Sequence, residues 1–174
     1  MTKQTKLIAG ILAALAVLIA ALLVFSRAGR QTGLETQEAR TLIFTKNGAA
    51  VLTLTEDDIR ALPSETFDAT VRASGARPRP AVYRGVEIHE LIKAAGVSAD
   101  EISSLVFNGA DLYVTTVQTE ELSEYGNIYI AFECDGEPMK SRADGGDGPF
   151  QVIVLNDYYS LRWCKYLSEV EIVE

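Results

Sequence analysis

The sequence has few of the residues from which metal sites and nucleophilic active sites are built. Its 174 residues include one histidine and two cysteines, and no cysteine precedes Cys134. A metal site needs more protein ligands than two cysteines supply. His89 has no serine or cysteine partner in a catalytic pattern, which is typical of an ordinary helix residue. The sequence therefore predicts no metal site and no catalytic residue.

The two cysteines, Cys134 and Cys164, leave two alternatives open. Outside the cytoplasm they could form a disulfide that closes a loop of about 30 residues and stabilises the fold by about 3–4 kcal/mol in the chain-entropy model. Alternatively, both remain free thiols that pack as small apolar side chains. Both fall on predicted strands, and geometry decides between the alternatives, because Cα atoms more than about 7 Å apart cannot be bridged.

Basic residues are also scarce. The chain has 16 lysines and arginines against 24 aspartates and glutamates. Lys3, Lys6 and Arg27 belong to the N-terminal segment, so the remainder carries 13 basic and all 24 acidic residues, a net charge of −11. Such a surface repels phosphate backbones and anionic lipid head groups. We therefore expect no nucleic-acid partner.

Charge is absent altogether from one long stretch. Residues 7–25 (LIAGILAALAVLIAALLVF) are 19 apolar or small residues. As a helix they would span roughly 28 Å, close to the hydrocarbon thickness of a bilayer. We interpret 1–6 as a short cytoplasmic N-terminus, 7–25 as a transmembrane signal anchor and 26–40 as a polar linker. The alternative is a cleaved signal peptide, whose apolar region is usually only about 7–15 residues long.

The charges that flank the apolar stretch predict its orientation. Lys3 and Lys6 precede it, while Arg27 and Arg30 follow it. Basic residues near the very N-terminus usually keep that end in the cytoplasm. We expect a single-pass protein of the cell membrane with its main domain outside the cytoplasm.

Residues 41–174 have the pattern of one α+β domain with a mixed β-sheet. Asn47-Gly48 between two β-rich runs predicts a type I′ hairpin turn, because both positions need positive φ. Thr55 followed by three acidic residues predicts a short helix, and residues 89–95 predict a second. A loop is expected at 73–80. The predicted strands are 41–46, 49–54, 65–72, 102–107, 112–118, 127–134, 150–155, 161–166 and 169–173.

Five segments of this region carry short motifs. They are YRGVEI with LIKAAGV at 83–97, ADLY at 110–113, IYIAFE through GEPM at 128–139, GPFQVIV at 148–154 and WCKYLSEVEI at 163–172. In this order they resemble the motifs of the sulfite-oxidase-like, molybdopterin-binding oxidoreductase domain, over about residues 41–174. Gln151 stands where that family more often has arginine. The resemblance implies the family's fold and makes molybdopterin a candidate cofactor.

The family's metal ligand has no counterpart in the aligned segment. Catalytic members carry a cysteine whose thiolate binds molybdenum, within a C-A-G-N-R segment upstream of the G-V motif, because a soft sulfur donor suits the metal. The corresponding residues 73–77 (ASGAR) place Ala73 at the cysteine position. The hydroxyl of Ser74 is a poor substitute for a thiolate. We therefore expect no oxygen-atom transfer at molybdenum and no bound cofactor.

Four arginines, Arg72, Arg77, Arg79 and Arg84, lie within 13 residues of the acidic domain. Guanidinium groups bind phosphate and carboxylate oxygens in a forked geometry. Ser74, Arg77, Arg79 and Arg84 are thus candidate ligands of a small anion, in a pocket derived from that of the pterin phosphate. The alternative is a solvated loop whose arginines pair with surface carboxylates.

These observations favour a membrane-anchored, non-catalytic binding or interaction module of this fold, whose partner is another protein or a small anionic ligand. A molybdopterin-dependent oxidoreductase, or its electron-transfer partner, that holds the cofactor without a cysteine is the enzymatic alternative. A small-anion sensor that uses the arginine loop is the third hypothesis.

Overall fold

The computed structural model describes residues 11–21 and 39–174. The chain divides into two compact units, Met1–Thr32 and Gly33–Glu174. In the first unit, residues 11–21 are helical and all are exposed. The rest of the predicted anchor, and the predicted linker up to residue 38, lie outside the described residues. Within the described ranges, no helix is long and apolar enough to cross a membrane.

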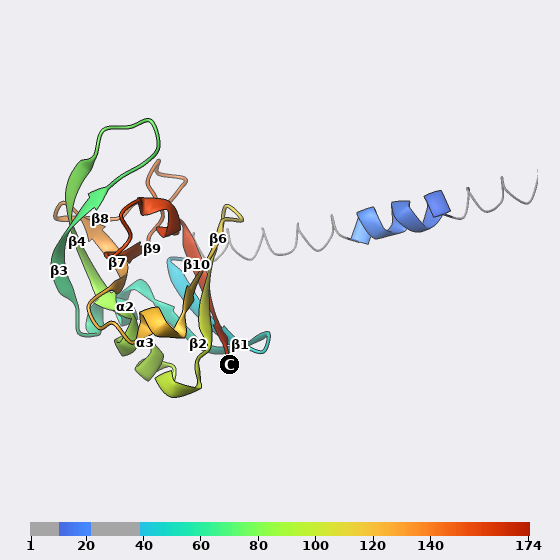
Figure 1. Ribbon diagram of the computed structural model, residues 1–174, viewed down its shortest axis with the longest axis horizontal. Coiled ribbons are helices and arrows are strands. Elements are labelled where there is room, and N and C mark those ends of the chain that lie inside the picture. Colours follow the sequence, from blue (N-terminus) through green and yellow to red (C-terminus); the bar gives the residue numbers. More distant parts are fainter. Residues whose placement is uncertain (1–10, 22–38) are drawn as a thin grey trace, which may run out of the picture. The chain divides into compact units, whose positions relative to one another are not determined.

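The second unit contains two five-stranded sheets (Figure 1). In the first sheet β1 and β10 are parallel and the other pairs are antiparallel, so the sheet is mixed, as predicted. Its order is β2 (Ala49–Thr55), β1 (Thr41–Lys46), β10 (Leu167–Val173), β5 (Ser104–Gly109) and β6 (Val114–Gln118).

The second sheet is antiparallel and carries the candidate site. It is built from β3 (Glu65–Val71), β4 (Arg79–Glu87), β7 (Ile128–Cys134), β8 (Glu137–Pro138) and β9 (Gln151–Val154). One edge of β7 pairs with β4, and the other pairs with β8 and β9. Because β7 lies between these strands, residues far apart in sequence meet along it. Buried side chains of both sheets form one hydrophobic core.

Short helices complete the domain. They are α2 (Glu56–Ala61), α3 (Ile88–Ala94), α4 (Thr119–Leu122) and the 3₁₀ helices η1 (Ala99–Glu101) and η2 (Ser160–Arg162). Thr55 caps α2 in a capping box with Asp58, as its sequence predicts. Figure 1 shows α2 and α3 at the end of the domain opposite the β3–β4 loop.

The local turn signals are confirmed. Asn47 and Gly48 both have positive φ, 54° and 75°, between β1 and β2. Gly96, one residue beyond the C-cap of α3, has φ 70°. These positions need the left-handed region, which asparagine and glycine tolerate best.

Two strand predictions are wrong. The predicted loop 73–80 is shorter, because β4 begins at Arg79, and its residues 79–85 pair with the whole of β3. The strand was not predicted because Pro80 and Gly85 disfavour a strand locally. The predicted strand 161–166 is absent. Its first residues form η2, and Tyr166 adopts φ 53°, which no strand accommodates.

Candidate functional site

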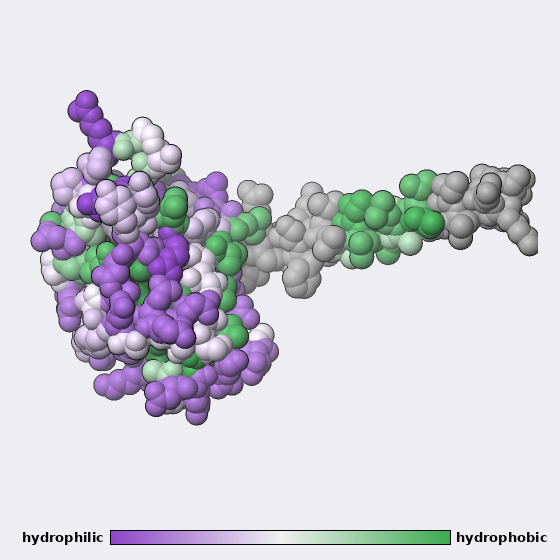
Figure 2. Space-filling view, in the orientation of Figure 1, coloured by the Kyte–Doolittle hydropathy of each residue, from purple (hydrophilic) through white to green (hydrophobic). Residues whose placement is uncertain are grey.

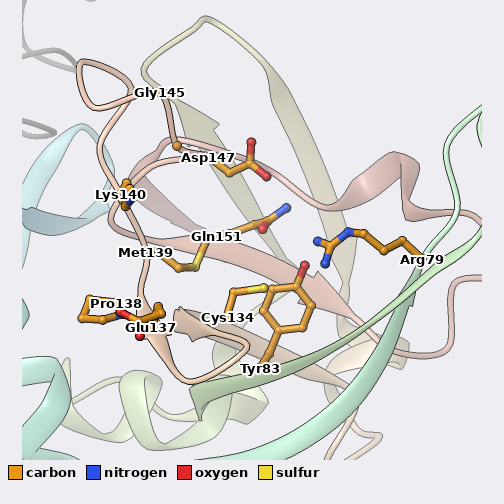
Figure 3. A pocket seen from close by; sticks show the side chains of 11 residues that line it. Arg79, Tyr83, Cys134, Glu137, Pro138, Met139, Lys140, Gly145, Asp147 and Gln151 are labelled. Atoms are coloured by element: carbon orange, nitrogen blue, oxygen red, sulfur yellow. The ribbon is translucent and has the colours of Figure 1, made fainter.

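A cavity of about 270 Å³ opens beside the ends of β4, β7 and β9 (Figure 3). Its volume is close to the lower end of the range for small-molecule pockets, about 300 Å³. The lining residues combine polar, apolar and sulfur-bearing side chains. They are Arg79, Tyr83, Cys134, Glu137, Pro138, Met139, Lys140, Gly145, Gly146, Asp147 and Gln151.

Gln151, the first residue of β9, contributes an unpaired acceptor to this pocket. Its side chain is 3% exposed, and within the described residues Oε1 is the one buried side-chain oxygen or nitrogen without a hydrogen-bond partner. In Figure 3 the Gln151 amide points toward the Tyr83 hydroxyl and the Arg79 guanidinium. Because an unpaired buried polar group costs about 1–3 kcal/mol, this oxygen is suited to a ligand that brings an N–H or O–H donor.

Tyr83 and Cys134 are placed side by side by the sheet. They are register partners on β4 and β7, and cross-strand partners present their side chains on the same face. Burial, followed by the neighbouring sulfur of Cys134, raises the pKa of Tyr83. The Tyr83 hydroxyl therefore stays protonated and can donate to the sulfur.

Arg79 supplies positive charge at the pocket wall. A side-chain hydrogen bond with Cys134 is the main cause that raises the pKa of Arg79. Its Nη1 also lies 3.2 Å from Asp135 Oδ2 in an exposed ion pair. The Lys140 side chain is a second cation, while Asp147 is paired with Lys165 at 3.0 Å. Glu137 adds a carboxylate to the same lining, so the cavity presents charges of both signs to a ligand.

The loop between β8 and β9 forms the opposite wall and folds tightly on itself. Gly146 donates to Ser141 O, and Gly148 donates to Lys140 O, each at 2.9 Å. A Cβ at Gly146 would lie 2.3 Å from the Lys140 carbonyl oxygen. Glycine is required at this position because the loop backbone approaches so closely.

A second cavity, of about 410 Å³, lies beside β3 and is less suited to a specific ligand. Its lining includes Arg72, Leu155 and Trp163. The Trp163 indole already donates to Val154 O at 3.0 Å. In the described part of the chain this cavity contributes no unpaired buried polar side-chain atom.

The family of the chain follows from a comparison with known domains. The model of the oxidoreductase molybdopterin-binding domain matches residues 35–174. The chain belongs to this family. The chain is 28% identical over 155 residues to the mitochondrial sulfite oxidase of Drosophila melanogaster. This match covers 74% of this chain and 26% of that protein.

The fold of the molybdopterin-binding domain is shared with a solved structure. The sulfane dehydrogenase SoxCD from Paracoccus pantotrophus matches with a TM-score of 0.62 and 20% identity, over 78% of this chain and 38% of that chain. This chain therefore spans less than half the length of either relative. The resemblance found in the sequence motifs is confirmed.

The structure separates the four arginines of the molybdopterin-binding domain. Arg79 lines the pocket, whereas Arg72 stacks on the Tyr158 ring at 5.0 Å. Arg84 lies 5.7 Å from the centre of the Phe132 ring and 3.9 Å from Glu133. Arg77 is exposed in the β3–β4 loop. Ser74 is exposed in the same loop and is absent from the pocket lining.

Of the two alternatives left open for the cysteines, the structure has the second, with both as free thiols. Cys134 faces the pocket next to Tyr83 and Arg79. Cys164 is fully buried, with its Sγ 3.9 Å from Phe107 O of the other sheet. Burial raises the pKa of Cys164 to about 12. The two sulfurs thus lie in different surroundings, and of the two cysteines only Cys134 lines the pocket.

Sequence reasoning identified Arg79 but missed the role of Tyr83, Cys134, Lys140 and Asp147. The motif comparison did contain a signal at Gln151, where a neutral amide replaces a more common arginine. That departure leaves an acceptor at the pocket in place of a cation.

Proposed function

We propose that this chain is a membrane-anchored, extracytoplasmic binding module for a molybdopterin-class ligand, held in the pocket between β4, β7 and β9. The observation that carries the proposal is the unpaired Gln151 Oε1 in a pocket that also presents Arg79. Family membership supports the ligand class. Because position 73 holds alanine, the module is proposed to act without oxygen-atom transfer.

The pocket residues fit the chemistry of a phosphorylated pterin. The N–H groups of a pterin ring would satisfy Gln151 Oε1, while Arg79 and Lys140 suit its phosphate. Tyr83 and Met139 supply apolar surface for the ring. When bound, such a cofactor supplies a metal centre capable of oxygen-atom and electron transfer. The residues of this chain would bind it, orient it and exclude water on the buried side.

One observation favours a second function, that of a molybdopterin-dependent oxidoreductase. A thiol, that of Cys134, lines the pocket although the family's cysteine position holds Ala73. A sulfur donor at the site restores the ligand type that the sequence comparison lacks. This function requires that the thiol reach the metal.

Gln151→Met is expected to weaken pterin binding while leaving the unliganded protein at least as stable. The thioether keeps the side-chain length but cannot accept a good hydrogen bond, so a donor of the ligand is left unpaired, at a cost of about 1–3 kcal/mol, or about 5- to 150-fold in affinity. The measurement is pterin fluorescence per mole of full-length protein purified from a host that makes the molybdenum cofactor. The matched control is Gln118→Met at an exposed position. Equal pterin content in wild type and Gln151→Met would contradict the proposed site.

The proposed anchor predicts that the full-length chain stays in membranes after sodium carbonate extraction. The basis is the apolar stretch 7–25. Lysine at both Leu15 and Leu18 should release the protein, because each lysine at the centre of a spanning helix costs about 2.5–3.5 kcal/mol. Alanine at both positions is the control.

Digestion of the domain by protease added outside intact spheroplasts tests the location of the domain. Release of the wild type by carbonate would refute the anchor, and protection from the protease would refute the orientation.

A further inference from the structure

We propose that Cys134 is the protein's thiolate ligand for the metal of the bound cofactor. Cys134 belongs to β7, whereas the family's usual ligand position follows β3. This inference rests on the proposed function, because it needs a metal-bearing ligand in the pocket. The family's ligand position, Ala73, lies in the exposed β3–β4 loop. Cys134 lies instead at the end of β7, opposite Tyr83, and lines the cavity.

Two polar side chains share the pocket wall with Cys134. Arg79 and Tyr83 line the same cavity as the sulfur, and Tyr83 is the cross-strand partner of Cys134. A thiolate is the form that binds metals. In the ligation step the S–H bond breaks, the proton passes to solvent, and the sulfur lone pair forms the bond to the metal. No oxidant or reductant is consumed.

The donor set also indicates what kind of metal this site takes. In the described part of the chain, no group of three or more histidine, cysteine, aspartate or glutamate side chains could hold a metal ion. A bare ion that needs several protein ligands does not fit one thiol. A metal delivered with its own sulfur ligands, such as the dithiolene of a pterin, needs only one more from the protein. The site therefore selects a metal held by its cofactor.

Gln151 provides independent evidence that a ligand belongs beside this thiol. Gln151 lines the same cavity, its Oε1 has no hydrogen-bond partner, and the residue is 3% exposed. Figure 3 shows the Cys134 sulfur beside the Tyr83 ring, while the Gln151 amide points toward the hydroxyl of that ring. A ligand bound in this cavity would therefore lie beside both Gln151 and the Cys134 sulfur.

The test is X-ray absorption at the metal edge of full-length protein purified with its cofactor. Cys134→Ser is expected to retain its pterin, since Arg79, Lys140 and Gln151 remain, but to show one sulfur neighbour of the metal fewer than the wild type. Cys134→Ala is the second variant, in case the serine oxygen itself ligates. Cys164→Ala is the matched control and should leave the coordination unchanged, because Cys164 is fully buried elsewhere.

Alkylation gives a second readout that does not depend on spectroscopy. Iodoacetamide should label Cys134 in cofactor-free protein and fail to label it in loaded protein, whereas buried Cys164 stays unlabelled in both. An unchanged sulfur count in Cys134→Ser with pterin present would overturn the ligand assignment and leave the proposed function intact. Wild-type protein without any pterin would overturn both. These two failures are therefore distinguishable.

Discussion

Replacing Arg79 with alanine is expected to lower the pocket's affinity for a phosphorylated pterin by about 10- to 150-fold. A hydrogen bond to a charged group contributes about 1.5–3 kcal/mol, and this variant removes the guanidinium at the pocket wall. The same change also removes a donor to the Cys134 sulfur. The measurement is the pterin retained per mole of full-length protein after gel filtration over a dilution series.

Arg77→Ala is the matched control for Arg79→Ala. Arg77 lies two residues before Arg79, in the β3–β4 loop, and is absent from the pocket lining. Both variants remove one positive charge, so a general electrostatic effect would lower retention equally. Equal losses would show that the acidic domain as a whole, and not the pocket, responds to the charge. Unfolding stability should change by less than about 1 kcal/mol, because the Arg79–Asp135 pair is exposed.

Replacing Gly85 with alanine is expected to destabilise the domain by about 3 kcal/mol. Gly85 lies in β4 opposite Ala131 of β7, next to a shift in the register of the two strands. A Cβ at this position would lie 2.6 Å from Ile130 O and 2.9 Å from Ala131 Cα. Both contacts are to backbone of the central strand, so the sheet itself must move to relieve them.

Urea unfolding followed by tryptophan fluorescence measures this effect, because Trp163 is the only tryptophan and packs edge-on against Tyr83 of β4. The urea midpoint should fall while the slope stays the same. Val82→Ala, at an exposed position of the same strand, is the control and should cost less than about 1 kcal/mol. A wild-type midpoint for Gly85→Ala would mean that β4 and β7 are not packed as described.

Local signals in the sequence predicted much of the fold. The Asn47-Gly48 turn, the cap at Thr55 and the apolar, strand-forming run of β7 each depend on neighbours a few positions away. β4 escaped prediction because Pro80 and Gly85 oppose a strand locally. Its formation depends on pairing with β3 and β7 along its length. Long-range pairing of this kind has no signature within a short window.

The candidate site was less predictable than the fold for the same reason. Arg79 stood out because it belongs to a cluster of four arginines within 13 residues of an otherwise acidic domain. From the sequence, Cys134 was considered only as a possible disulfide partner of Cys164. Its pairing with Tyr83 across the sheet has no signal in the neighbouring residues. The unpaired oxygen of Gln151 is a property of the packed site. The sequence could show only that a commoner arginine was missing there.

Pterin and molybdenum content of the full-length wild-type protein tests the central claim most directly. The protein would be purified in detergent from a host that makes the molybdenum cofactor, and its fold verified by a cooperative urea transition. The proposed pocket predicts near-stoichiometric pterin, with metal bound alongside it through Cys134. Folded protein with neither pterin nor molybdenum would contradict the account and leave a domain that keeps the family fold for another purpose.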